Sequence, residues 1–363
     1  MDSSEHDVEG IDLEPASKRA SDYPLDDVMV RSETRTVSEI VKRIDRGRYV
    51  MNPDFQRDFV WSKEKQSKLI ESCVMRIPLP VLYVAEADDG RVTVVDGLQR
   101  LSTFLAFTTG RLRLTGLGRE HPLEGKTIEQ LPINLRERIE DTQLTLYILD
   151  KNAPEAARLD IFERVNSGVP LTRQQMRNAL YNGHATHWLA GMSREDEFLK
   201  ATGGSLQSLT MRDREAINRF CAFYILGWKS YTTGDMDEFL AKALRAMNQP
   251  GFDLSDLRSR FLRSMKRNQM LFGRHAFRKS LVYEKDDASR SVINIALFDV
   301  LSVGLARVRS EVMQRERGVL KSEVLKIMQD EQFVHCITFS TNSTSQVRDR
   351  FKIMFRAIER FFV

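Results

Sequence analysis

The segment Asp96-Gly97-Leu98-Gln99-Arg100 combines residue types that can bind a phosphate group. It follows a β-branched run at 92–95 and precedes an apolar helical pattern, so we expect a strand, a sharp turn and a helix start. Backbone N–H groups at a helix start attract anions, and the Arg100 guanidinium would add a planar fork of donors. Asp96 could hold a hydrated Mg²⁺ or position a water molecule. The alternative is that Asp96 caps the helix and Arg100 is a solvated surface side chain.

A second segment, Phe55-Gln56-Arg57, lies in a polar loop that ends at Trp61. Aromatic side chains beside a Gln-Arg pair are suited to stacking on a base and holding a phosphate. The aromatics could instead be core anchors, with Arg57 as a surface charge. Further along, Asn166 and Gly168 end a predicted helix, and this pattern is also explained as ordinary helix punctuation.

A basic stretch over 258–279 contains no Asp or Glu. A solvated helix face usually mixes charges of both signs, so the stretch predicts a surface that contacts phosphates. An ordinary basic exterior face is the alternative. The candidate nucleic-acid-binding residues are Arg258, Arg263, Lys266, Arg267, Arg278 and Lys279.

Charge is distributed unevenly over the 363 residues. Residues 1–30 carry nine acidic and two basic side chains, a formal charge of −7, which leaves +11 for the rest of a chain whose total is +4. A basic body attracts polyanions, and an acidic arm can compete for the same surface. The alternative is that this mild excess of charge serves only solubility. Because residues 1–30 lack a periodic apolar pattern, we expect a disordered arm that can be removed without unfolding the body.

Hydrophobic periodicity predicts the elements that position these segments. Helices are expected over 37–44 and from Ser62 through Ile77, followed by a hairpin of strands at 81–85 and 92–95 and another strand at 144–149. Later stretches are nearly all helical. They lie at 155–165, 217–226, 239–247, 257–272, 292–308, 320–328 and 347–361. The expected domains are a disordered acidic arm at 1–30, a small α/β domain at 31–150 and a mostly helical domain at 151–363.

Three cysteines far apart in the sequence exclude a disulfide framework and a zinc or redox motif of the CxxC type. No run of about 18 apolar residues predicts a transmembrane helix, and the N-terminus lacks a secretory signal pattern. We therefore expect a cytoplasmic protein that does not associate with membranes.

Taken in order, the segments Phe55-Gln56-Arg57, Asp96-Gly97-Leu98-Gln99-Arg100 and Phe162 to Leu171 resemble the N-terminal domain family of GmrSD-type restriction systems. The resemblance covers residues 31–363, most firmly 50–180, and implies an α+β protein with a ParB/sulfiredoxin-like first domain. It also implies a bacterial modification-dependent restriction or anti-phage defence system.

By this resemblance Asp96, Gln99 and Arg100 would bind and hydrolyse a nucleoside triphosphate, with Asp96 as the Mg²⁺ ligand. Gln56, Arg57, Gly97 and Asn166 would line the same pocket. The expected activity is that of a Mg²⁺-dependent nucleoside triphosphatase that acts as a DNA-associated switch or sensor. Two alternatives remain: a non-catalytic module that binds DNA or a partner, and a ParB-like nicking nuclease.

This sequence departs from the family pattern in two respects. Leu98 replaces the usual Gln of the Asp-Gly-Gln-Gln-Arg element, which affects turnover or base choice only if that side chain contacts the nucleotide. No nuclease signature follows the helical region, so we expect a stand-alone member that senses and does not cut. A separately encoded effector or nuclease is then a natural partner beside DNA, and a homo-oligomer is compatible with the sequence.

Overall fold

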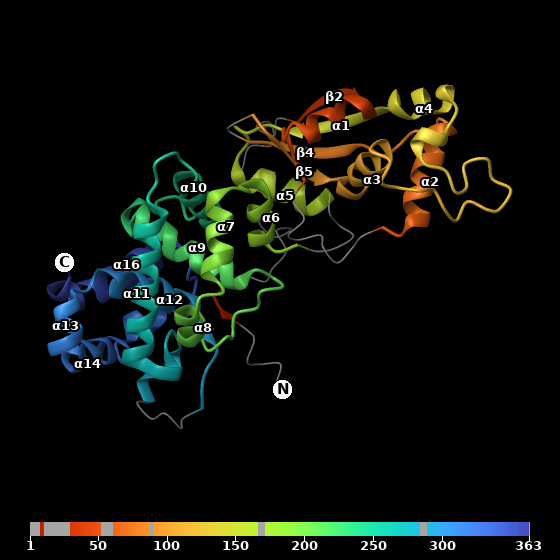
Figure 1. Cartoon of the computed structure of the whole chain (residues 1–363). Coiled ribbons are helices and arrows are strands. Elements are labelled where there is room, and N and C mark those ends of the chain that lie inside the picture. The colour runs from red at the N-terminus through yellow and green to blue at the C-terminus, as the bar shows by residue number, and fades with distance from the viewer. Residues whose placement is uncertain are drawn as a thin grey trace. The chain divides into compact units, whose positions relative to one another are not determined.

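The computed structural model describes residues 8–10, 30–51, 61–87, 90–165, 171–283 and 289–362. The chain divides into two compact units (Figure 1). The sheet unit comprises Ala16–Leu171 and Gln175–Asn182, and the helical unit comprises Met1–Pro15, Thr172–Gln174 and Gly183–Val363. A small five-stranded sheet and a mostly helical remainder confirm the predicted α+β fold class.

The sheet has five strands in the order β2-β6-β4-β5-β3. β2 pairs antiparallel with β6, and β4 pairs antiparallel with β5, whereas the β6–β4 and β5–β3 pairs are parallel. The predicted hairpin and the strand at 144–149 are confirmed, while β2 was not expected. The strand bounds are Val30–Thr36 (β2), Tyr49–Val50 (β3), Leu82–Glu86 (β4), Val92–Asp96 (β5) and Gln143–Leu149 (β6).

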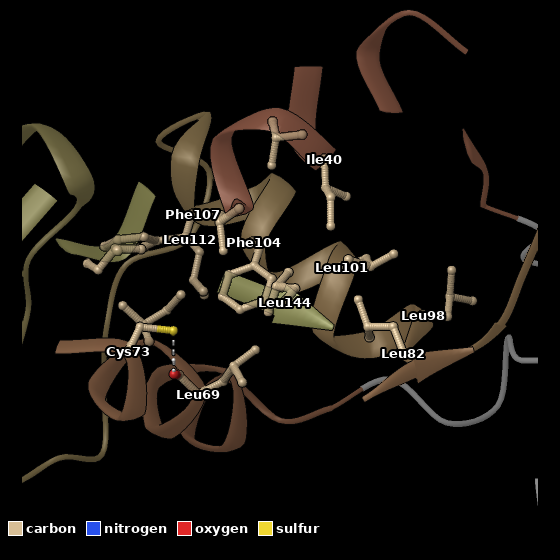
Figure 2. Packing of buried hydrophobic residues seen from close by; sticks show 14 of the residues in the cluster. Ile40, Leu69, Cys73, Leu82, Leu98, Leu101, Phe104, Phe107, Leu112 and Leu144 are labelled. Atoms are coloured by element: carbon tan, nitrogen blue, oxygen red, sulfur yellow. Dashed lines mark hydrogen bonds between the residues drawn. The ribbon is translucent and has the colours of Figure 1, made fainter. Parts of the chain in front are cut away.

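Apolar side chains of alternate strand residues pack with four helices into one core (Figure 2). Leu82 and Val84 of β4 and Leu144 of β6 meet Ile40, Leu69, Leu101 and Phe104 from the helices. α5 contacts β5. The helix bounds are Val37–Asp45 (α1), Lys63–Val74 (α2), Leu98–Thr108 (α3), Ile133–Glu140 (α4) and Glu155–Val165 (α5), with α6 at Arg173–Leu180.

Helix caps explain two of these bounds and correct one prediction. The Ser62 hydroxyl accepts a hydrogen bond from Lys65 N–H, as the sequence predicted for the start of α2. The same helix ends at Val74, because Arg76 adopts a left-handed backbone conformation with φ of 60°. Ile77 is therefore not part of the buried helix face, and its side chain is 47% exposed.

The helical unit is built around α12, in which every residue except the last is buried. α12 packs against α9, α11 and α16, so it lies at the centre of these helices. All six predicted helical stretches of this unit are confirmed. The bounds are His184–Met192 (α7), Asp196–Thr202 (α8), Arg212–Ile225 (α9), Met236–Met247 (α10), Leu254–Phe272 (α11), Ile295–Arg307 (α12), Ser310–Arg315 (α13), Arg317–Ile327 (α14), Glu331–Cys336 (α15) and Thr344–Ile358 (α16).

Part of the acidic arm is structured, which corrects the prediction for residues 1–30. Val8–Glu9 forms β1, which pairs in parallel with β7 at Ile293–Asn294 in the helical unit. The Val8 side chain is 7% exposed, and Glu9 forms an ion pair with Lys279. The sequence did not predict β1, because two residues are too few to show a hydrophobic periodicity.

We expect Val8→Asp to destabilise the helical unit by about 2 kcal/mol, because a carboxylate replaces a buried apolar side chain. Val30→Asp is the matched control, since Val30 is 41% exposed. Thermal unfolding followed by circular dichroism measures both. Equal, small changes in the two variants would show that β1 contributes nothing to stability.

Candidate functional site

The candidate site lies where β5 runs into α3. Asp96 is the last residue of β5 and pairs with Tyr83 of β4. Its side chain is 39% exposed, so the carboxylate is accessible at the end of the strand. Leu98 begins α3 two residues later, as the sequence predicted.

Gly97 makes this sharp turn sterically allowed. Its φ is 99°, in the left-handed region, and a Cβ atom at this position would lie 2.1 Å from Leu82 Cδ2. Gly97 is also the N-cap of α3, so the cap supplies no side-chain acceptor for the first-turn N–H groups. The suggestion that Asp96 caps the helix is therefore wrong.

Arg100 does not present its guanidinium to solvent, which corrects both of its predicted roles. The residue is 8% exposed, and Nη2 donates to Asp96 Oδ2 at 2.7 Å and to the Val81 carbonyl at 3.1 Å. Nη1 donates to the Pro80 carbonyl. Burial lowers the pKa of Arg100, and the Asp96 charge opposes that effect. Arg100 thus joins the start of β4 to the end of β5 and fixes the Asp96 carboxylate.

Gln99 links the site to the end of the preceding loop. Its Oε1 accepts a hydrogen bond from the Trp61 backbone N–H at 3.2 Å. Lys65 Nζ lies 4.6 Å from the centroid of the Trp61 ring, which gives this position a cation–π contact. The predicted site residues Gln56, Arg57 and Asn166 lie outside the described residues.

Leu98 belongs to the core and not to the site. Its side chain is 9% exposed and packs in the cluster with Leu82 and Leu101. The departure from the family pattern at this position therefore removes no polar group from the exposed side of the turn.

The basic stretch over 258–279 is only partly a surface, and Arg267 and Arg278 are corrected to structural residues. Arg267 is 5% exposed and donates to the carbonyls of Leu305 and Val308. Burial, with the Arg263 charge nearby, lowers the pKa of Arg267 to about 10. Arg278 is 1% exposed and donates to the Thr202 carbonyl and to Ser205 Oγ.

The other predicted nucleic-acid-binding residues of this stretch differ in their partners. Arg258 forms an ion pair with Glu195 at 2.8 Å, and Lys279 pairs with Glu9. Arg263 is half-buried and Lys266 is exposed. Of the six candidates, two are buried and two form ion pairs, and contact of the stretch with nucleic acid stays a prediction.

Sequence reasoning missed a buried polar cluster at the start of α5. The Tyr181 hydroxyl donates to Glu155 Oε2, and Arg158 Nη1 lies 3.9 Å from that same carboxylate oxygen. Arg158 also donates to the Glu86 carbonyl at the end of β4. The cluster therefore fastens α5 to the sheet. Two charges three residues apart on a helix were the only sequence signal for it.

These observations define an α+β domain with an exposed carboxylate and an uncapped helix at one strand-to-helix turn. Residues 37–182 match the model of the GmrSD restriction endonuclease N-terminal domain, the family that the motifs resemble. The match associates the chain with restriction systems. A search of curated proteins finds no match to the chain.

Two further properties of the described residues limit the chemistry. None of their helices combines the length and the apolar character that crossing a bilayer requires. Within the same residues, His, Cys, Asp and Glu side chains form no group of three or more that could hold a metal ion. Among the described residues, Asp96 is therefore not part of a preformed cluster of such ligands.

We expect Arg100→Ala to lower the free energy of unfolding by about 2 kcal/mol or more, because three acceptors lose their donor in a mostly buried position. Arg111→Ala is the control, since Arg111 is exposed and its side chain donates to the neighbouring Thr109 hydroxyl. Denaturant unfolding measures both variants. Equal stability of the two would mean that the Arg100 contacts do not hold the turn together.

Proposed function

We propose that this chain is a nucleotide-dependent, DNA-associated component of a restriction system. In this proposal the sheet unit binds a nucleoside triphosphate at the β5–α3 turn and hydrolyses it. The nucleotide state then changes how the chain engages DNA or a separately encoded effector. The family match supports the link to restriction, and the geometry of the turn supports the nucleotide site.

The observation that carries the proposal is the free start of α3 directly after an exposed, fixed carboxylate. Gly97 has no side chain to occupy the first-turn N–H groups, so these groups and the helix dipole can accept a phosphate. Asp96 lies one residue away, with its Oδ2 held by Arg100. A phosphate and a polar carboxylate would thus meet at one turn.

A Mg²⁺ ion could be held at this turn through one carboxylate oxygen of Asp96. Mg²⁺ is commonly held by one or two carboxylates together with substrate phosphates and waters. Asp96 Oδ1 would be the ligand from this chain, because Oδ2 already accepts from Arg100. Bound there, Mg²⁺ would neutralise charge on the phosphates, while Asp96 holds its position through Arg100.

The structure changes the roles assigned within this proposal. Arg100 becomes a positioning residue that orients Asp96, since its donors are used by the protein. Gln99 becomes a positioning residue for Trp61, whose backbone N–H donates to Gln99 Oε1. Gln56, Arg57 and Asn166 keep their proposed place as nucleotide contacts.

Because the Arg100 guanidinium already donates to acceptors within the protein, one alternative is also favoured. In this alternative the chain binds a nucleotide without hydrolysing it. A free arginine would stabilise charge on the transferring phosphoryl group, and this one is engaged. The nicking-nuclease reading needs acidic groups near Asp96, and no three-ligand cluster exists among the described residues.

We expect Asp96→Asn to reduce nucleoside triphosphate hydrolysis by at least about 100-fold while nucleotide binding survives, because Asn keeps an acceptor for Arg100 but loses the charge. Phosphate release by the purified chain, with Mg²⁺ and with or without DNA, measures turnover, and calorimetric titration with a non-hydrolysable analogue measures binding.

Glu39→Gln is the matched control, since Glu39 lies on α1 of the same unit in an exposed pair with Arg43. The control should keep full hydrolysis. Hydrolysis unchanged in Asp96→Asn would refute the catalytic assignment, and binding by the parent without any hydrolysis would support the non-catalytic module.

A further inference from the structure

Helix α16 carries a row of basic side chains on its exposed face. Arg348, Lys352 and Arg356 are all exposed, and they are separated by four residues each. Arg360 continues the same spacing in the short turn that follows the helix. We call Arg348, Lys352 and Arg356 the α16 basic face.

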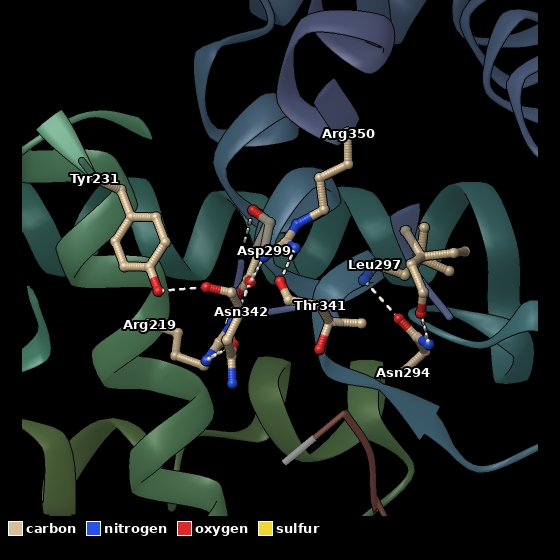
Figure 3. A network of polar contacts seen from close by, with 10 residues as sticks. Arg219, Tyr231, Asn294, Leu297, Asp299, Thr341, Asn342 and Arg350 are labelled. Carbon is tan, nitrogen blue, oxygen red and sulfur yellow. Dashed lines mark hydrogen bonds and ion pairs between the residues drawn. The ribbon is translucent and has the colours of Figure 1, made fainter. Parts of the chain in front are cut away.

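The opposite face of α16 is fixed in the helical unit by a buried ion cluster (Figure 3). Arg350 is fully buried and donates to Asp299 Oδ2 at 2.7 Å and to the Thr341 carbonyl. Asp299 Oδ2 also accepts from Arg219 Nη2 of α9 at 2.6 Å. Val347 and Phe351 add buried apolar contacts on that side. The buried side of α16 therefore determines which side chains point outward.

The cations of the α16 basic face are less neutralised than Arg258 and Arg260 of α11. In the described parts of the chain, Lys352 and Arg356 have no ion-pair partner, and Arg348 lies 3.9 Å from Asp349. On α11, by contrast, Arg258 and Arg260 form ion pairs at 2.8 and 2.6 Å. A cation already paired with a carboxylate gains less from a phosphate, so Lys352 and Arg356 are more available to a phosphate than Arg258 and Arg260 are.

The spacing of the basic face suits a regularly charged polymer. Four residues advance about 6 Å along a helix and turn it by about 40° past one revolution, so three such side chains form a slowly drifting row. Phosphates on one strand of DNA advance about 3.4 Å each along the duplex axis, and long basic side chains can reach consecutive or alternate phosphates.

The α16 basic face differs from helix faces that bind membranes, because it lacks exposed large apolar side chains among the described residues. Helices that lie in a bilayer interface insert large apolar side chains beside their cations. No large apolar side chain of α16 is among the exposed ones of the described residues. The face is therefore better matched to nucleic acid phosphates than to lipid.

We propose that the α16 basic face contacts the phosphate backbone of duplex DNA. The inference rests on the DNA association in the proposed function and assigns that association to a surface. It places the contact on α16, where the sequence had indicated the stretch at 258–279. Contacts of this kind provide affinity and salt dependence without reading the base sequence.

The test compares two full-length variants that each lose three positive charges. One is Arg348→Gln, Lys352→Gln, Arg356→Gln. The control is Arg43→Gln, Lys200→Gln, Lys242→Gln, whose three cations pair with carboxylates at 3.3, 3.2 and 2.8 Å. Fluorescence anisotropy of a labelled 25-base-pair duplex is recorded from 50 to 200 mM KCl, with circular dichroism to confirm folding.

We expect the α16 variant to bind at least about tenfold more weakly at 50 mM KCl, and its plot of log affinity against log salt to flatten by about 2 to 3. The control should change affinity by less than about threefold. If the α16 variant binds like the parent, the assignment to α16 is wrong and the DNA association stands.

A parent that binds no duplex at any salt concentration overturns this inference and the DNA part of the proposed function together. Nucleotide hydrolysis, measured through Asp96, is independent of that result. Binding of the parent to vesicles with 30% phosphatidylserine through these residues, without duplex binding, overturns the inference in favour of a lipid surface.

Discussion

The turn between β5 and α3 has no room for a side chain, and this restriction determines how the strand joins the helix. Gly97 lies so close to Leu82 of β4 that only a hydrogen atom fits. Because the chain turns directly from strand to helix, Asp96 stays at the strand end and the first-turn N–H groups of α3 stay uncapped. Arg100, one helical turn later, is then in reach of both Asp96 and the start of β4. The turn thus places the Asp96 carboxylate, the start of α3 and the Arg100 side chain close together.

Buried arginine side chains connect chain segments by hydrogen bonds in both units. In the sheet unit Arg100 and Arg158 each join a helix to the backbone of β4 or the residues before it. In the helical unit Arg267 and Arg278 donate to backbone carbonyls, and Arg350 donates to Asp299. A guanidinium has five donors in a rigid plane, so it can satisfy several carbonyls where chain segments cross. A part of the positive charge in the sequence is therefore used inside the protein.

In the buried ion cluster of Asp299, Arg219 and Arg350, opposite charges compensate for the loss of water. Asp299 and Arg350 are fully buried, and the carboxylate accepts from both Arg219 and Arg350. Burial lowers the pKa of Arg350 to about 10, whereas the coulombic effect of Asp299 raises it. Removing one member of a buried ion cluster leaves the others uncompensated, so the three side chains must act together. That requirement makes the orientation of α16 specific.

The sequence alone determined the strand-to-helix turn, the order of the elements and the family of the first domain. Local patterns were sufficient there, because Ser62 caps a helix within three residues and Gly97 permits a turn within one. Tertiary structure decided which charges are available. Arg100 and Arg267 read as surface cations, yet both donate to carbonyls from segments that are distant in the sequence or across a helix packing contact. A two-residue strand such as β1 likewise depends on its partner β7, since its own residues carry no period. Burial and partner choice depend on contacts between distant residues, and a one-dimensional pattern does not contain those contacts.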